Sequence, residues 1–161
     1  MAIKVGDALP GNVKLKEMGE SGPRDVSVEE LCKGKRVVLF AVPGAFTPTC
    51  SMKHLPGFVS GAGSLKTKGV DEVVCVSVND AFVMDAWGKA QGANGKVRML
   101  ADGNGEFTRS IGLELDASGF GMGKRSQRYA MVVKDCKVEQ LHVEPGGGLN
   151  VSSCEAVLGK L

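Results

Sequence analysis

Two continuous apolar runs constrain the fold of this chain more than any other feature. "RVVLFAV" spans residues 36–42 and "EVVCVSV" spans residues 72–78, and both are rich in β-branched side chains without a regular polar alternation. Strands of this kind are typical of a parallel sheet that helices cover on both faces. The two runs therefore predict an α/β protein whose central strands are fully buried.

Segments with helical character lie between and after these runs. Residues 57–68 fall between them, and residues 80–91 follow the second run, with Asn79 or Asp80 as the helix cap. "VRMLAD", residues 97–102, predicts a third strand. Strands and helices that alternate in this way form right-handed parallel crossovers.

The last third of the chain predicts a different arrangement. "GEFTRSIG", residues 105–112, has the pattern of a short helix, and residues 128–135 and 137–144 flank Cys136 like the arms of a hairpin. Glu155 follows Ser152 at capping-box spacing, so a last helix is expected to begin at Ser152. The order predicts a mixed central sheet with helices on both faces, which is the thioredoxin-like order. The length predicts one domain, residues 1–161.

Composition excludes several classes of protein. Twenty basic and eighteen acidic residues leave a net charge of +2, which predicts no nucleic-acid partner and no basic membrane-binding surface. The apolar runs are too short to span a membrane, and the N-terminal residues form no apolar signal region. We expect a soluble cytoplasmic protein. A mitochondrial location would apply if a leader had been removed, and a peroxisomal one if the terminal "GKL" were read as a weak Ser-Lys-Leu signal.

The cysteines argue against metal binding. There are five, an odd number: Cys32, Cys50, Cys75, Cys136 and Cys154. No two of them are separated by only two or three residues, which argues against a structural zinc site and against a CxxC redox pair. Without an export signal we expect most of the thiols to be reduced at rest. The sequence assigns no function to Cys32 or Cys136.

One cysteine stands in a segment with unusual backbone control, "AVPGAFTPTCSMKHLPGF", residues 41–58. Thr47 is a good N-cap and Pro48 a good first helical residue, so Cys50 would occupy the third helical position. A helix N-terminus favours an anion and hence a thiolate, although the dipole alone contributes little, so a fixed cation is expected nearby. Spacing alone leaves open that Thr47 is an ordinary cap and Cys50 an ordinary small residue.

The same segment resembles a known family. "PGAFTPTC" matches the peroxiredoxin pattern Pro-x-x-x-Thr-x-x-Cys, and the fuller "VPGAFTPTCSMKHLPGF" is similar to the type II, or atypical, peroxiredoxins, the fifth subfamily. The resemblance continues through "SVNDAFVMDAWGKA", "VRMLADGNGEFT" and "RYAMVV", and so covers nearly the whole chain. It implies a thioredoxin fold, a homodimer, no metal and no organic cofactor.

The resemblance also implies an activity. Members are thiol-dependent peroxidases that reduce hydrogen peroxide, alkyl hydroperoxides or peroxynitrite and serve cell redox homeostasis. Thioredoxin, glutaredoxin or glutathione would regenerate the enzyme. By the same resemblance, Cys50 is the peroxidatic cysteine, Thr47 supplies a hydroxyl, Pro43 shields the site and Arg128 is the fixed cation. Only the resemblance separates Arg128 from Arg125, which would otherwise read as another surface charge.

The regeneration of Cys50 stays open at this stage. We expect attack by an external thiol to be the main of three routes, with Cys154 second and Cys75 third. Some family members use a cysteine before the C-terminal helix, where this chain has Val151, and Cys154 follows one helical turn later. Other members carry a cysteine in the strand that corresponds to "VVCVSV", and Cys75 matches it. Either internal route would require a local rearrangement.

Two other interpretations are weighed against a peroxidase. His54, four residues after Cys50, would suit a Cys-His hydrolase, but no orienting acid or oxyanion-hole motif stands nearby, so a structural histidine is expected. A non-enzymatic redox sensor on the same fold is the second alternative, and catalytic turnover would separate it from an enzyme. "GFGMGKRS", residues 119–126, departs from a phosphate-binding loop and is expected to be a flexible loop.

Overall fold

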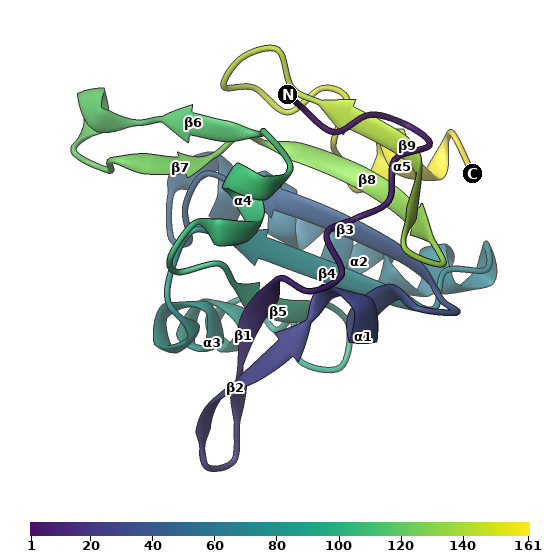
Figure 1. The fold of residues 1–161 in the computed structure, drawn as a ribbon, viewed down its shortest axis with the longest axis horizontal. Helices are drawn as coiled ribbons and strands as arrows, with labels where there is room; N and C mark the ends of the chain where they lie inside the picture. The colour runs from purple at the N-terminus through teal and green to yellow at the C-terminus, as the bar shows by residue number, and fades with distance from the viewer.

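The computed structural model of the protein describes residues 1–161. Seven strands form one mixed sheet in the order β2-β1-β5-β4-β3-β8-β9, and β6 and β7 form a separate two-stranded ribbon (Figure 1). The elements are β1 (Lys14–Gly19), β2 (Gly22–Ser27), α1 (Val28–Cys32), β3 (Arg36–Val42), a π-helical turn (Cys50–His54), α2 (Leu55–Thr67), β4 (Glu72–Ser77), α3 (Ala81–Ala90), β5 (Arg98–Ala101), α4 (Glu106–Ser110), β6 (Glu114–Asp116), a 3₁₀ turn (Ser118–Phe120), β7 (Lys124–Ser126), β8 (Tyr129–Lys134), β9 (Lys137–Val143) and α5 (Cys154–Leu158).

Strand β3 lies inside the sheet between two partners. It pairs with β4 in parallel, with Leu39 opposite Val74, and with β8 antiparallel, with Leu39 opposite Met131. Every residue of β3 after Arg36 is buried. The continuous apolar runs thus form central strands, as the sequence predicts, and the predicted mixed α/β sheet is confirmed.

The sheet separates two hydrophobic cores. Because side chains alternate along a strand, Leu39 of β3 joins the core under α1 and α4, whereas Phe40 joins the core under α2, α3 and α5. In Figure 1, α4 lies in front of the sheet and α2 behind it. Three cysteines, Cys50, Cys75 and Cys154, belong to the second core. None of the helices is long and apolar enough to cross a membrane.

The ends of two helices test the capping predictions. Asp80 caps α3, because its carboxylate accepts a hydrogen bond from the N–H of Val83 at 2.8 Å, which confirms one of the two predicted caps. The predicted start of the last helix at Ser152 is wrong by one residue. Ser153 caps α5 by accepting from the N–H of Ala156 at 3.1 Å. Ser152 is instead buried, and its N–H and hydroxyl donate to the carboxylate of Glu144.

Two parts of the sheet architecture do not follow from the sequence pattern. Strands β1 and β2 form an edge hairpin whose residues are mostly exposed or half-buried, so they lack the apolar signature of a core strand. The expectation of a flexible loop at residues 119–126 is wrong for its last part. Residues 124–126 form β7 and pair with β6, with Lys124 opposite Asp116. This ribbon is too short for an alternating pattern to indicate it.

A disulfide joins Cys32 at the end of α1 to Cys136 at the tip of the β8–β9 hairpin, with Cα atoms 5.0 Å apart. The expectation that the thiols are mostly reduced is therefore wrong for this pair, and holds for Cys50, Cys75 and Cys154, which are free. The two residues are 104 positions apart, so no local spacing indicates the bond. Only the folded sheet brings α1 and the hairpin tip together.

Candidate active site

A short loop between β3 and α2 positions Cys50. The backbone N–H of Ser51 donates to the carbonyl of Thr47 at 2.9 Å, so helical bonding begins at Thr47 as predicted. The helix then widens into a π-helical turn from Cys50 to His54, where Leu55 donates to the carbonyl of Cys50. Such turns are rare and frequently occur at functional sites. The irregular turn begins at the cysteine itself and ends where the regular helix α2 starts at Leu55.

Several bonds fix the loop in front of this turn. The N–H of Ala45 donates to the side-chain oxygen of Asn79 at 3.0 Å, which ties the loop to the end of β4. The Thr47 hydroxyl donates to the carbonyl of Gly44 at 2.6 Å, so its oxygen keeps lone pairs to accept another bond. Phe46 has a φ of 63°, an unfavourable value for a residue with a side chain. The surrounding bonds hold this strained loop in place.

Arg128 meets Cys50 inside the protein. Its Nη2 donates to the Cys50 sulfur at 3.1 Å, while only 6% of Arg128 and none of Cys50 is exposed. Charges interact more strongly away from water, so this contact would stabilise a thiolate far more than a surface contact would. Nε of Arg128 is buried without a hydrogen-bond partner, which leaves the guanidinium with unfilled donor capacity.

His54 orients the guanidinium. Nη1 of Arg128 lies 2.8 Å from Nδ1 of His54, and Nε2 of His54 lies 2.8 Å from the carbonyl of Ser152. An arginine only donates and a carbonyl only accepts, so Nδ1 must accept and Nε2 must carry the proton. Burial, then the charge of Arg128, lowers the pKa of His54 to about 4. The imidazole is therefore neutral at pH 7.

Glu144 completes a ring of hydrogen bonds around Arg128. Its N–H donates to the carbonyl of Arg128 at 2.9 Å. Its Oε2 accepts from the N–H groups of Asn150, Val151 and Ser152 and from the Ser152 hydroxyl, at 2.7–2.9 Å. Burial opposes ionisation of Glu144, but these bonds from Ser152 and its neighbours lower its pKa. Glu144 thus fixes the segment before α5 in the position where the carbonyl of Ser152 accepts the hydrogen bond from His54.

The structure brings together only part of what the sequence predicts for this site. Cys50 and Arg128 are in contact, whereas the Thr47 hydroxyl bonds Gly44 and makes no hydrogen bond to Cys50. Pro43 is half-buried beside the site, and its carbonyl lies 3.4 Å from Nη1 of Arg125. Arg125 therefore contacts the active-site loop and is more than an isolated surface charge.

Sequence reasoning missed the roles of His54, Glu144 and Ser152. His54 bonds Arg128 and the carbonyl of Ser152 and makes no hydrogen bond to Cys50, which does not fit a Cys-His hydrolase. The one available signal was a histidine one helical turn after a motif cysteine. Nothing in the sequence indicates that Glu144 is anchored to Ser152, because both lie outside the motifs.

Both candidate resolving cysteines are buried. Burial, then the charge of Cys50, raises the pKa of the Cys75 thiol well above its usual value, and Arg128 opposes the rise. Burial, then the charge of Glu155, raises the pKa of Cys154 to about 11. Cys154 packs directly against Gly61 of α2. Of these two cysteines, Cys75 is thus the one whose pKa is affected by the charges of Cys50 and Arg128.

One surface hollow lies away from Cys50. It encloses about 430 Å³, is lined by charged residues such as Glu17, Lys89 and Arg98, and contains none of the residues around Cys50. Nowhere in the chain do three or more His, Cys, Asp or Glu side chains gather in a way that could hold a metal ion. The candidate site is therefore a buried thiol and guanidinium beside a constrained loop.

Comparison with known proteins decides what kind of site this is. The Redoxin family matches residues 4–158. Peroxiredoxin-2B of Arabidopsis thaliana is 51% identical over 160 residues, which cover 99% of this chain and 98% of the relative. This chain belongs to the type II peroxiredoxins. It is accordingly a thiol peroxidase, an oxidoreductase that consumes a peroxide at the expense of a thiol.

Two further similarities support the peroxiredoxin assignment. The crystal structure of reduced Prx3 in complex with hydrogen peroxide from Vibrio vulnificus has a TM-score of 0.94 and 52% identity, and the match covers 98% of each chain. The predicted thioredoxin-like fold is thereby confirmed. Peroxiredoxin-2E, chloroplastic, of Arabidopsis thaliana is 50% identical over 163 residues, 99% of this chain and 70% of that relative.

The neutral His54 of this peroxiredoxin predicts a pH-dependent stability. Its folded pKa of about 4 lies below the ordinary value of 6.5. Between these two pH values, His54 binds a proton in the unfolded chain but not in the folded chain. The contribution to stability is complete above about pH 6.5 and is lost as the pH falls towards 4, a difference of roughly 3 kcal/mol. Urea unfolding across this range, compared between the parent and His54→Gln, should show a flatter profile in the variant. If the free energy of unfolding falls equally steeply with pH in the parent and in His54→Gln, a buried neutral His54 is contradicted. His142→Gln, which changes a half-buried histidine, is the matched control.

Proposed function

We propose that Cys50 is the peroxidatic cysteine and that Arg128 is the cation that activates it. The observation that carries the proposal is the 3.1 Å contact between Nη2 of Arg128 and the Cys50 sulfur in a site closed to water. A thiolate is the reactive form of cysteine, and a fixed neighbouring cation favours it. Pro43, in the loop before Thr47, restricts access to the sulfur from that side.

In the first half-reaction, the Cys50 thiolate attacks the terminal oxygen of a peroxide. The sulfur–oxygen bond forms as the oxygen–oxygen bond breaks, and the departing oxygen takes the electron pair and then a proton. The products are a Cys50 sulfenic acid and water or an alcohol. The departing oxygen develops negative charge, so preorganised donors should lower the barrier.

Two kinds of donor and one acceptor surround the place where this charge develops. The backbone N–H groups of Thr49 and Cys50 donate to no protein acceptor, as expected in the first turn of a helix. Arg128 keeps unfilled donor capacity at Nε. The Thr47 oxygen can accept a hydrogen bond from a hydroperoxide while its own hydroxyl donates to the carbonyl of Gly44. We assign the peroxide to the space between Thr47, Cys50 and Arg128.

In the second half-reaction, an external thiol attacks the sulfenic acid. Water leaves, a mixed disulfide forms at Cys50, and a second thiol releases the Cys50 thiol and carries away the disulfide. Cys50 is fully buried, so the thiol reaches it only after the Cys50–His54 turn rearranges. We keep the external thiol as the main route, because both internal candidates have raised pKa values and few thiolates at neutral pH.

Two internal routes remain as alternatives to the external thiol. The sequence ranks Cys154 ahead of Cys75. Cys75 lies close enough to Cys50 and Arg128 for their charges to affect its pKa, whereas the pKa of Cys154 is affected by burial and Glu155, and this proximity favours the reverse order. A disulfide needs Cβ atoms about 3.8 Å apart, so either route requires movement of a buried segment. Of the two internal routes, we propose Cys75 ahead of Cys154.

The partners follow from the proposed chemistry. We propose hydrogen peroxide and alkyl hydroperoxides as substrates, with peroxynitrite as a further candidate, and thioredoxin, glutaredoxin or glutathione as the reductant. A homodimer stays a prediction, and the exposed side chains of Phe46 and Met52 beside the site would suit such an interface. Cytoplasmic placement also stays a prediction, as do the mitochondrial and peroxisomal alternatives, since one relative is named chloroplastic.

Substitutions at the proposed site should separate the roles of its residues. Cys50→Ser should abolish turnover with thioredoxin or glutathione while the protein stays folded. Arg128→Gln removes a donor to the departing oxygen, and Thr47→Val removes the acceptor for the hydroperoxide proton. Each should lower the second-order rate with peroxide by about 100-fold or more, the size of effect known for loss of one oxyanion donor. Steady-state and stopped-flow peroxidase assays measure these effects. A parent-like rate in Cys50→Ser would end the assignment, and one stoichiometric oxidation without turnover would favour a redox sensor.

Peptide mapping after one equivalent of peroxide should identify the route of regeneration. We expect a mixed disulfide at Cys50 when glutathione is present, and parent-like turnover in both Cys75→Ser and Cys154→Ser. The two variants are matched controls for each other because both thiols are buried in the same core. A near-quantitative disulfide between Cys50 and either residue, with loss of thioredoxin-dependent turnover in that variant, would replace the external route.

A further inference from the structure

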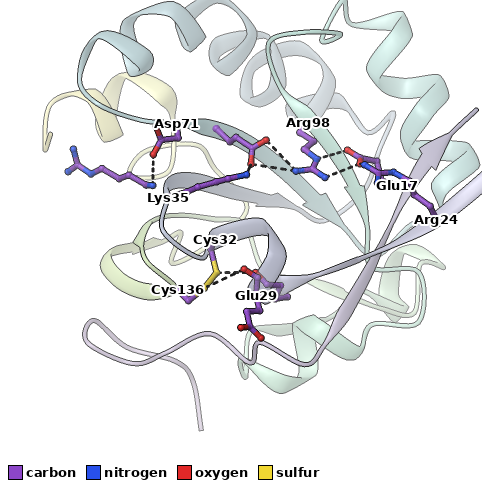
Figure 2. Close-up of polar contacts among 11 residues, drawn as sticks. Glu17, Arg24, Glu29, Cys32, Lys35, Asp71, Arg98 and Cys136 are labelled. Carbon is purple, nitrogen blue, oxygen red and sulfur yellow. Dashed lines mark hydrogen bonds and ion pairs between the residues drawn. A yellow bond between two sulfur atoms is a disulfide. The ribbon is translucent and has the colours of Figure 1, made fainter.

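The Cys32–Cys136 disulfide lies outside the peroxidase site. Figure 2 shows it between the end of α1 and the hairpin tip, with the backbone of Glu29 beside both sulfurs. Cys32 belongs to the core under α1 and α4, whereas Cys50 belongs to the core on the opposite face of the sheet. The disulfide also lies near the start of β3 and Cys50 beyond its end, and seven strand residues span roughly 20 Å. The two sulfur centres are therefore chemically separate.

Non-covalent bonds hold the hairpin tip in place independently of the disulfide. The carbonyl of Cys136 accepts from the N–H of Leu9 at 2.8 Å. The carboxylate of Asp135 accepts from the N–H of Gly34 at 2.8 Å, and the N–H of Asp135 donates to the carbonyl of Lys35 at 2.9 Å. Opening the S–S bond would leave these contacts intact. The two sulfurs would then stay close enough to re-form the bond.

Each of the two sulfurs also lies near a backbone carbonyl that could accept a hydrogen bond from the reduced thiol. The Cys32 sulfur lies 3.0 Å from the carbonyl oxygen of Val28, and the Cys136 sulfur lies 3.9 Å from the carbonyl oxygen of Glu29. A carbonyl oxygen has two lone pairs, so each can accept an S–H in addition to its helical bond. The reduced pair would therefore bury no unsatisfied thiol, and both redox states fit the same fold.

The two sulfurs differ in access. Cys32 is 1% exposed, whereas Cys136 is half-buried at the tip of the hairpin, with a φ of 66° that turns the chain sharply. A thiolate attacks a disulfide at the sulfur it can reach. The attack therefore falls on Cys136, and Cys32 is the leaving group.

We propose that Cys32 and Cys136 form a second, reversible thiol–disulfide site that exchanges with a low-molecular-weight thiol and its disulfide. The thiolate attacks the Cys136 sulfur, the S–S bond breaks, and Cys32 takes the electron pair and a proton. A second thiolate attacks the mixed disulfide, releases Cys136 as a thiol and leaves as the small-molecule disulfide. The reverse sequence closes the site. The exchange needs neither peroxide nor Cys50, so it stands apart from the proposed peroxidase mechanism.

Thiol mapping in glutathione buffers tests the proposal on the full chain. Folded parent and Cys50→Ser proteins are equilibrated at a series of ratios of reduced to oxidised glutathione, quenched with acid, unfolded and alkylated with one reagent before reduction and a second after it. Mass spectrometry of the Cys32 and Cys136 peptides should show both thiols appearing together as the ratio rises. The transition should be the same from either direction and unchanged in Cys50→Ser. Removing the more accessible partner with Cys136→Ser should leave Cys32 reduced at every ratio.

Three results would overturn the proposal. If the bond stays closed for hours in excess reduced glutathione under native conditions, it is a permanent cross-link. If Cys32 and Cys136 stay alkylatable in excess oxidised glutathione, the pair does not close. If the transition in the parent disappears in Cys50→Ser, the exchange runs through the peroxidatic cysteine. A failed peroxidase assay would affect none of these readings, because each follows only the Cys32 and Cys136 peptides.

Discussion

The contact between Arg128 and Cys50 depends on the pairing of two strands that are distant in sequence. Strand β8 runs antiparallel to β3, and their register places Ala41 opposite Tyr129. Arg128 directly precedes Tyr129, and the loop that carries Cys50 leaves β3 just after Ala41 and Val42. A slip of one residue would send the side chains of β8 to the opposite face of the sheet. The buried register of β3 and β8 is thus the constraint on which the site depends.

A buried guanidinium is costly unless its surroundings compensate for lost water. Here the compensation comes from one neutral group and one anionic group. His54 presents a lone pair from the helical turn after Cys50, and Glu144 contributes a carboxylate that fastens the segment before α5. A protonated His54 would oppose both the guanidinium and the hydrogen-bond pattern. Burial, and then this repulsion from Arg128, lower the pKa of His54 to about 4, so the charge state of one imidazole is coupled to the position of Arg128.

The sequence could predict what depends on local pattern and burial. The apolar runs of β3 and β4, the Asp80 cap and the helix start at Thr47 all follow from residue type and spacing. The sequence could not predict what depends on contacts across the fold. The Cys32–Cys136 bond spans 104 residues, and Glu144 acts through a backbone segment that has no motif. The β1–β2 hairpin was missed because an exposed edge lacks an apolar signature.

The central claim is that His54 orients Arg128 so that Arg128 can activate Cys50. Trp87, the one tryptophan, donates from its indole N–H to the Ser51 hydroxyl at 2.9 Å and so reports on the residue next to Cys50. Stopped-flow tryptophan fluorescence should follow the oxidation of reduced protein by hydrogen peroxide. The account predicts a clearly slower second-order reaction in His54→Gln than in the parent and in His142→Gln at pH 7. A parent-like rate in His54→Gln, in a protein that remains folded, would contradict it.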